Sequence, residues 1–200
     1  TVLRTQSKYE EAAALCRRVG AMGVDRAGST EQSLGCTLQA QGKYDEAMAA
    51  FQKALEIRMK VFEENNATVL QTQNSIASVF DEQGKYDQAL EIYRHILAIQ
   101  LCEKYTDVGD TYNNIALVLH AQFKFNEAIE VHQKALVHRK KALGEDHVDV
   151  GATYNNMGLT LHDLGKYDEA MMLFEKGCWI RVKALGNDHP EVGSSYHNMA

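Results

Sequence analysis

Gly42-Lys43-Tyr44-Asp45-Glu46-Ala47 is one copy of a hexapeptide that recurs along this 200-residue chain. The stretch returns as GKYDQA at 84–89, as FKFNEA at 123–128 and as GKYDEA at 165–170, and a divergent copy, SKYEEA, lies at 7–12. Successive copies start 35, 42, 39 and 42 residues apart. A period of this length is typical of an array of helical repeats.

Each copy separates two stretches in which apolar residues recur at the spacing of one helix face. We therefore predict two antiparallel helices joined by a short turn. In the turn, Gly suits a left-handed residue that ends the first helix, and Asp or Asn is expected to cap the second helix. Phe123 replaces Gly in the third of these registered copies, so that turn is expected to be reshaped.

Small residues flank every turn at fixed distances. At the seventh position before the turn Gly, or its replacement, the copies have Gly35, Ala77, Ala116 and Gly158. At the fifth position after it they have Ala47, Ala89, Ala128 and Ala170. Two helices approach closely only where both lack bulk, so we predict that the helices cross at these positions. A larger side chain there would overpack the crossing and cost about 1–3 kcal/mol.

Together with an aromatic residue four positions beyond the small residue after the turn (Phe51, Tyr93, Phe174), the pattern resembles the tetratricopeptide repeat. The 42-residue spacing, the linkers at 142–147 and 184–190, and the Asn pairs that follow Tyr112 and Tyr154 are similar to the kinesin light chain and nephrocystin-like branch. The resemblance implies an all-α fold, a right-handed superhelical solenoid of antiparallel helix pairs.

We expect one repeat array over residues 1–200. It comprises a partial repeat at 1–24, repeats at about 25–66, 67–105, 106–147 and 148–189, and a truncated helix at 190–200. In the linkers, Gly144 and Gly186 should each end a helix, Asp or His should cap the next one, and Pro190 suits a first helical turn. The segment 102–107 is three residues shorter than its counterparts and lacks Gly, so local superhelical geometry is expected to change there.

Composition and charge exclude several classes of partner. The net charge of −6 argues against nucleic acid, because phosphate binding needs clustered Lys and Arg. The basic run at 139–141 is instead expected to close a helix, where cations complement the helix dipole. No stretch approaches the roughly 20 apolar residues of a membrane-spanning helix, so no membrane insertion is predicted. With no secretory or transit signal at Thr1, we expect a cytoplasmic protein that could associate with the cytoskeleton.

Metal, cofactor and catalytic sites are not predicted. The cysteines have no metal-ligand spacing and are interpreted as reduced, mostly buried thiols: Cys16, Cys36, Cys102 and Cys178. Half of the eight His residues are repeat equivalents, which explains them without a metal. Carboxylate pairs such as Glu63 and Glu64 are expected on solvated positions, and no nucleophile or phosphate-loop motif occurs, so we predict no enzyme activity and no cofactor.

The resemblance implies that the first helix of each pair lines a concave face. Equivalent residues would form rows along it, and the candidate peptide-binding residues are Asn74, Ser78, Asp81, Asn113, Asn114, Leu117, His120, Asn155, Asn156, Leu159, His162, His197 and Asn198. An Asn side chain offers donors and an acceptor, as a peptide group does, so a row of them can bond the main chain of an extended ligand. Two alternatives stay open: a solvated polar face, or bonds between adjacent repeats.

The sequence therefore predicts a protein-interaction scaffold that binds extended peptide segments of a partner or cargo protein, with motor and cytoskeletal cargo as candidates. Inward Gln, Asn, Ser and His replace the Lys and Arg of a carboxylate clamp, which argues against chaperone-tail binding. One alternative is a regulatory or sensor arm of a larger enzyme whose catalytic domain lies outside residues 1–200. Another is a structural array that self-associates through its open repeat ends.

Overall fold

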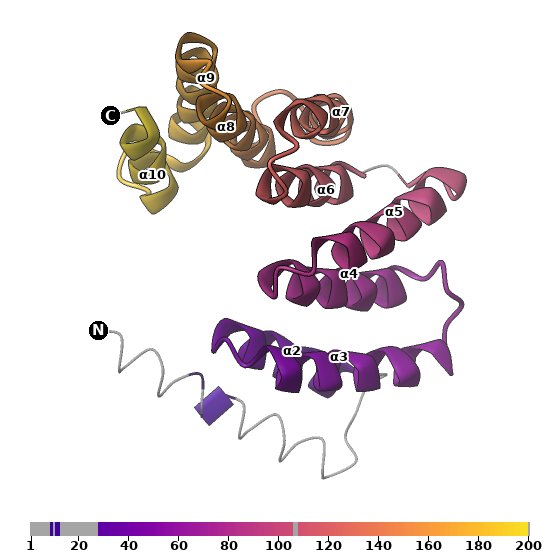
Figure 1. Cartoon of the computed structure of the whole chain (residues 1–200). Helices are drawn as coiled ribbons and strands as arrows, with labels where there is room; N and C mark the ends of the chain where they lie inside the picture. The colour runs from indigo at the N-terminus through magenta and orange to yellow at the C-terminus, as the bar shows by residue number, and fades with distance from the viewer. Residues whose placement is uncertain (1–8, 10, 13–27, 106–107, 200) are drawn as a thin grey trace. The chain divides into compact units, whose positions relative to one another are not determined.

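The computed structural model describes residues 9, 11–12, 28–105 and 108–199. The predicted partial repeat at 1–24, with most of the divergent hexapeptide and Cys16, thus lies largely outside the described residues. From residue 28 onward the described part is helical, as predicted (Figure 1), and its helices are α2 (Ser29–Ala40), α3 (Tyr44–Met59), α4 (Ala67–Glu82), α5 (Tyr86–Cys102), α6 (Gly109–Ala121), α7 (Phe125–Leu143), α8 (Val148–Asp163), α9 (Tyr167–Leu185) and α10 (Pro190–Met199).

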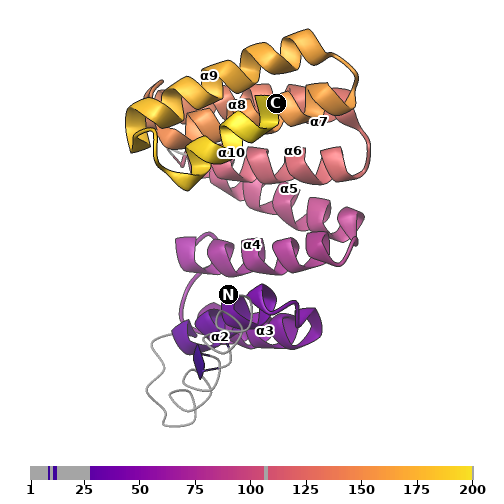
Figure 2. The same cartoon turned by 90° about the vertical axis from the view of Figure 1, so that its left-hand side faces the viewer.

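The chain divides into two compact units, residues 1–96 (unit 1) and 97–200 (unit 2). In unit 1, α2 pairs with α3, and in unit 2, α6 pairs with α7 and α8 with α9. Figures 1 and 2 show the two helices of each pair running antiparallel across a short turn. The core of unit 1 includes Leu38, Phe51 and Val79, and unit 2 has a cluster around Val150 and another around Phe174.

The helices cross at the small residues, as predicted. A Cβ atom added to Gly35 would lie 2.5 Å from the ring of Phe51, and one added to Gly158 would lie 2.6 Å from the ring of Phe174. Ala77 and Ala116, at the equivalent positions, are fully buried. The rings of Phe51 and Phe174 therefore pack directly on the bare backbone of α2 and α8.

Three of the four turns have the predicted Gly in the left-handed region, with φ of 73° at Gly42, 72° at Gly84 and 81° at Gly165. The expectation that Phe123 reshapes its turn is wrong. Phe123 itself has φ of 61°, and the Lys124 N–H still donates to the Leu119 carbonyl at 2.9 Å, as in the other turns. Its ring is 80% exposed and lies edge-on to the ring of Phe125, with 6.0 Å between centroids. The flanking helices therefore impose a backbone conformation that costs about 1–2 kcal/mol for a residue with a Cβ.

The predicted caps are right in the linkers and wrong in the turns. Gly144 and Gly186 end α7 and α9, the His147 side chain accepts from the Asp149 N–H, and α10 begins at Pro190. In the turns, by contrast, Lys124 and Lys166 occupy the N-cap position without a side-chain cap. The acidic residue there lies inside the first turn, where its charge complements the helix dipole.

Two further expectations concern α5 and the cysteines. Lys104, just beyond α5, takes the left-handed conformation with φ of 55°. Residues 106 and 107 lie outside the described part, so changed geometry over 102–107 stays a prediction.

Cys178 is buried, but Cys36 and Cys102 are exposed, so the expectation of mostly buried thiols is wrong for the described cysteines. Cys36 lies on the first-helix face that the core does not cover, and Cys102 is the last residue of α5.

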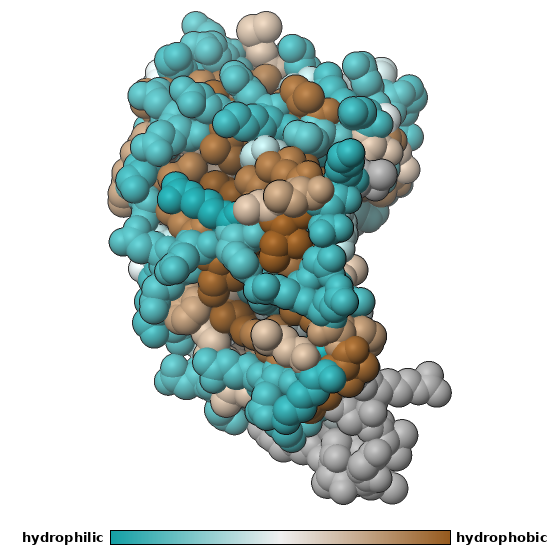
Figure 3. Space-filling model, turned by 90° about the vertical axis from the view of Figure 1, so that its right-hand side faces the viewer, coloured by the Kyte–Doolittle hydropathy of each residue, from teal (hydrophilic) through white to brown (hydrophobic). Residues whose placement is uncertain are grey.

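Hydrophobic residues reach the surface in places among hydrophilic ones, as Figure 3 shows for one face. Among the helices of the described ranges, none combines the length and the apolar character needed to cross a bilayer.

Candidate functional site

The predicted Asn rows of unit 2 contain bonds between neighbouring repeats. Asn156 Nδ2 donates to Asn113 Oδ1 at 3.2 Å, and Asn198 Nδ2 donates to Asn155 Oδ1 at 2.9 Å. Asn113 and Asn155 are buried. The alternative of inter-repeat bonding thus applies to both pairs. Each bond uses one group of each amide, so further donor and acceptor capacity remains on Asn156 and Asn198.

Unit 1 repeats this register with other side chains. Gln32 Nε2 donates to Ser75 Oγ at 2.9 Å, so a first-row residue again bonds a second-row residue of the following repeat. Farther along the same face, Gln39 Nε2 donates to Ser78 Oγ at 2.9 Å and to Glu82 Oε1 at 2.8 Å. Polar side chains of unit 1 therefore satisfy one another across the repeats.

The candidate residues differ in exposure. The exposed candidates are Leu117, Leu159, His162 and His197. The half-buried candidates are Asn74, Ser78, Asp81, Asn114, His120, Asn156 and Asn198. Partial burial, and then the nearby charge of Glu82, raise the pKa of Asp81 above its usual value. Leu117 and Leu159 are each 38% exposed at equivalent positions of α6 and α8. The equivalent residues of unit 1 are Cys36 and Ser78, so the apolar pair belongs to unit 2 alone.

A carboxylate joins two of the three candidate His residues of unit 2, His120 and His162. Asp163 Oδ2 lies 3.2 Å from His120 Nε2, and Asp163 Oδ1 lies 3.2 Å from His162 Nδ1. The second nitrogen of His120 lies 3.1 Å from Thr160 Oγ1. These contacts fix both imidazole rings beside the exposed leucines. Over the ranges that the structure describes, no three His, Cys, Asp or Glu side chains gather as metal ligands.

A set of buried arginines was not predicted from the sequence. Arg58, Arg139 and Arg181 stand sixteen residues after the first residue of their turns, and all three are buried. Arg139 Nη1 donates to the Asp149 carbonyl at 2.9 Å and to Thr153 Oγ1, and Arg139 Nη2 lies 2.5 Å from Asp110 Oδ1. The run at 139–141 closes α7 as predicted, with Lys140 and Lys141 in its last turn. The Arg139 head group in addition bonds two neighbouring first helices.

The other two arginines make the same kind of contact. Arg58 Nη1 donates to the Thr68 carbonyl at 2.7 Å and to Thr72 Oγ1, and Arg181 Nη1 donates to Ser195 Oγ at 2.8 Å. Each arginine joins the end of a second helix to the first helix of the next repeat, a contact that we call the arginine junction. Its recurrence at one offset was a signal in the sequence, but an arginine is usually read as a surface residue.

His132 is the second buried group that the pattern did not reveal. It stands four residues after Ala128, where the other repeats have Phe51, Tyr93 and Phe174. Its side chain is fully buried, and neither ring nitrogen has a hydrogen-bond partner among the described residues. Burial, followed by the charges of His120 and Arg139, lowers its pKa from 6.5 to about 4. His132 is therefore a neutral core residue that fills the place of an aromatic ring.

Comparisons with known proteins agree with this architecture. The family model described as the tetratricopeptide repeat matches residues 25–101 and 107–178. No curated protein sequence matches the chain. Among solved structures, BtubC (BKLC) from P. vanneervenii has a TM-score of 0.76 at 22% identity, over 100% of this chain and 82% of that one.

Two further structures are similar. The nearly identical repeats of a putative kinesin light chain from Podosopora anserina have a TM-score of 0.70 at 21% identity, over 91% of this chain and 92% of that one. Aspartyl phosphate phosphatase F from Bacillus subtilis has a TM-score of 0.76 at 19% identity, over 88% of this chain and 45% of that one. At these identities the likeness shows the fold alone. Because the family model spans most of its length, the chain belongs to the tetratricopeptide repeat family, whose repeats are scaffolds for protein–protein interaction.

Proposed function

We propose that the first-helix face of unit 2 binds an extended peptide segment of a partner or cargo protein, in the manner of a kinesin light chain. The observation that carries the proposal is the exposure of Leu117 and Leu159 on helices whose other leucines, Leu119 and Leu161, are buried. An exposed apolar residue that recurs at one position of two repeats, among polar residues, is typical of a binding surface.

The neighbouring polar groups supply the remaining chemistry of such a site. Asn156 donates one side-chain N–H to Asn113, so its other N–H and its carbonyl oxygen can form hydrogen bonds with the main chain of a ligand. His120 and His162 are held by Asp163 and flank the leucines. In this proposal the apolar side chains of the ligand contact Leu117 and Leu159, while Asn114, Asn198 and His197 contact its polar groups. Asn74, Ser78 and Asp81 offer a polar face of the same kind on unit 1.

The test replaces both leucines by Ser, the residue that the second repeat carries at this position as Ser78. Peptides are first selected from a display library of unstructured peptides against the wild-type chain. Their affinity for Leu117→Ser/Leu159→Ser is then measured by fluorescence anisotropy. Since burying one leucine contributes about 1.5–3 kcal/mol, we expect the double variant to bind at least about tenfold more weakly.

Val137→Ser is the matched control, because Val137 is also exposed but lies on the second helix α7. This control should bind the selected peptides like the wild type, and all three proteins should have the same helical circular dichroism. Undiminished binding by the double leucine variant would refute the proposal. Asn113 and Asn155 are left intact, because their replacement would loosen the contacts between repeats.

The alternative, a regulatory arm of a larger enzyme, is supported by the likeness to aspartyl phosphate phosphatase F, of which this chain covers less than half. In that case the chain is part of a longer protein, and the arm would modulate a catalytic domain elsewhere in it. Deleting the repeats from that longer protein should then change its catalytic rate. An unchanged rate would leave peptide binding as the function of the repeats.

A further inference from the structure

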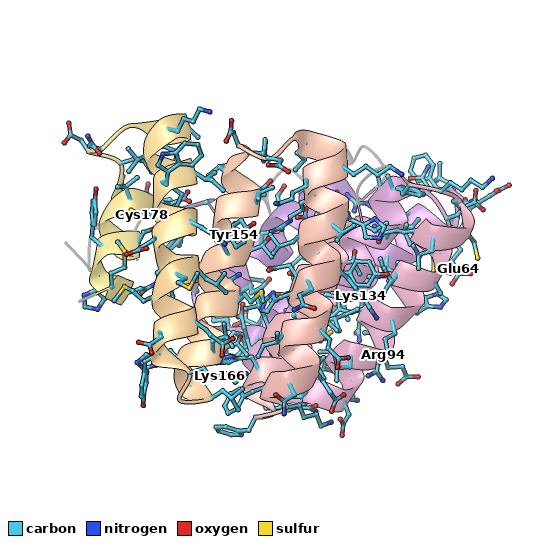
Figure 4. The ribbon with its side chains drawn as sticks, turned by 90° about the horizontal axis from the view of Figure 1, so that it is seen from above. Glu64, Arg94, Lys134, Tyr154, Lys166 and Cys178 are labelled. Atoms are coloured by element: carbon cyan, nitrogen blue, oxygen red, sulfur yellow. The ribbon has the colours of Figure 1, made fainter. Side chains whose placement is uncertain are left out.

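Unit 2 has a groove on the side of its second helices, away from the candidate peptide-binding residues. Its volume is about 470 Å³, and it lies between α7 and α9, with Tyr154 of α8 beneath it (Figure 4). Its lining includes Lys140, Tyr154, Met172, Glu175, Lys176 and Trp179. Lysines stand beside both aromatic rings: Lys140 Nζ lies 5.6 Å from the Tyr154 centroid and Lys183 Nζ lies 5.0 Å from the Trp179 centroid. The groove therefore has an aromatic floor and a charged rim.

The α9 side of the groove carries two large exposed apolar residues, Met172 and Trp179, which are 57% and 60% exposed. They are seven residues apart and so lie on one helix face. The other repeats do not have such a pair: the residues equivalent to Met172 are Ala49, Glu91 and Glu130, and those equivalent to Trp179 are Glu56, Ala98 and Val137. Packing of the repeat therefore does not require Met172 or Trp179, and an exposed pair of this size indicates a contact surface.

The charges on this face of α9 are arranged symmetrically around its centre. Asp168, Glu175, Lys176 and Lys183 are all exposed, and the first three have no ion-pair partner in the described parts of the chain. Suppose that a second α9 packs antiparallel to the first, with the midpoints between Glu175 and Lys176 of the two helices side by side. A residue that stands before the midpoint in one copy then lies opposite the residue at the same distance after the midpoint in the other copy. Glu175 then meets Lys176 of the second copy, Met172 meets its Trp179, and Asp168 meets its Lys183. Every one of these pairs is complementary in charge or in apolar character.

We propose that this surface binds a second copy of the chain, with α9 antiparallel to α9 and each Trp179 ring against the groove of the other copy. Such a contact is isologous, as most dimer interfaces are, because one patch serves both copies. The interface is built on one helix of each copy and is small, so a weak, concentration-dependent dimer is expected. This dimer leaves the first-helix face uncovered, and the proposal does not depend on peptide binding.

The experiment measures molar mass by sedimentation velocity over roughly a hundredfold range of protein concentration, since mass action governs a weak dimer. The wild type should change from monomer to dimer, and the emission of Trp179, the only Trp in the chain, should shift to shorter wavelength as it does so. Met172→Glu/Trp179→Glu should stay monomeric. This variant should keep the fold, because two other repeats carry Glu at the first position and one carries Glu at the second. Val137→Glu, on α7, should dimerise like the wild type.

Charge exchange separates this arrangement from nonspecific association. Glu175→Lys and Lys176→Glu should each be monomeric alone, because each places like charges opposite one another. Mixing the two single variants should restore a dimer, and so should combining both changes in one chain. A wild type that stays monomeric at every concentration would overturn the proposal and leave the groove to a different protein. A dimer that persists in Met172→Glu/Trp179→Glu, or no restoration on mixing, would overturn it as well.

Discussion

Two junctions at equivalent places in the array are built from different side chains. Between α7 and α8, Arg139 donates to a backbone carbonyl and a hydroxyl of α8 and also contacts Asp110 of α6. Between α5 and α6, the equivalent residue is Gln100, whose Oε1 accepts a bond from Thr111 Oγ1 at 2.8 Å. One junction thus has several charge-assisted bonds, and the other has a neutral bond between two side chains.

The difference indicates which of these two junctions of unit 2 is the firmer. A hydrogen bond to a charged group contributes about 1.5–3 kcal/mol, and a neutral one contributes about 1 kcal/mol. A buried guanidinium is also costly once its partners are lost. The arginine junction is therefore the stronger contact, and also the one that tolerates change least. The Gln100 junction is weaker and adjoins Lys104, whose left-handed backbone adds strain.

The largest effect is expected from Arg139→Gln, which makes the α7–α8 junction resemble the α5–α6 junction. The variant loses the bonds to the Asp149 carbonyl and Asp110 and keeps at most a neutral bond to Thr153, so its free energy of unfolding should fall by about 3 kcal/mol. Urea unfolding followed by circular dichroism measures the change. Lys141→Gln, an exposed residue of the same basic run, is the control and should alter stability by less than about 0.5 kcal/mol. If the free energy of unfolding fell as little in Arg139→Gln as in Lys141→Gln, the junction would contribute little to stability.

A smaller and pH-dependent effect is expected from His132, in the helix α7 that the arginine junction holds. Its pKa of about 4 in the folded chain lies below the ordinary 6.5, so the folded state disfavours the proton. The stability that this residue contributes is therefore complete above pH 6.5 and is lost as the pH falls towards 4. At pH 5, about 1.5 units below the ordinary pKa, the loss should be about 2 kcal/mol, since each pKa unit corresponds to about 1.36 kcal/mol.

His132→Phe places in the third repeat the residue found in the first and fourth, as Phe51 and Phe174. This variant should be more stable than the wild type at pH 5, and the gap should narrow towards pH 7, as measured by urea unfolding at each pH. A wild type whose stability changes with pH just as that of His132→Phe does would contradict the assignment of His132 as a neutral buried group.

Features set by local spacing could be predicted from the sequence. The turn glycines and the small residues at helix crossings follow from helical periodicity, and the structure has them in those places. Phe123 shows the limit of this reasoning. Its own preference opposes the left-handed backbone, yet two packed helices determine the turn. A residue's local preference is worth about 1–2 kcal/mol, and the packing of its neighbours can exceed that.

Features that depend on distant partners could not be predicted in this way. The rows of amides were visible, but the bond between Asn113 and Asn156 joins residues 43 apart and depends on rotamers that only the packed repeats define. The arginine offset was visible too, yet whether an arginine is buried depends on partners such as Asp149 and Thr153 in the following repeat. Leu117 and Leu159 are exposed, whereas Asn113 and Asn155 in another row of the same face are buried, so the row pattern alone did not show which side chains the repeats cover.

The smallest effect is expected from Gln100→Arg, which places the arginine of the other junctions at the α5–α6 contact. The new guanidinium can donate to Thr111 Oγ1, so the free energy of unfolding should rise by about 0.5–1 kcal/mol. The gain is smaller than the loss in Arg139→Gln, because a buried cation must recover its desolvation cost and the linker before α6 is three residues shorter. Gln100→Lys is the control. Lysine carries the same charge without the planar guanidinium group, so Gln100→Lys should gain less stability, since the junction uses the geometry of the guanidinium. A lower stability of Gln100→Arg than of the wild type would show that the α5–α6 junction cannot accept the arginine and that the two junctions differ in backbone as well as in side chain.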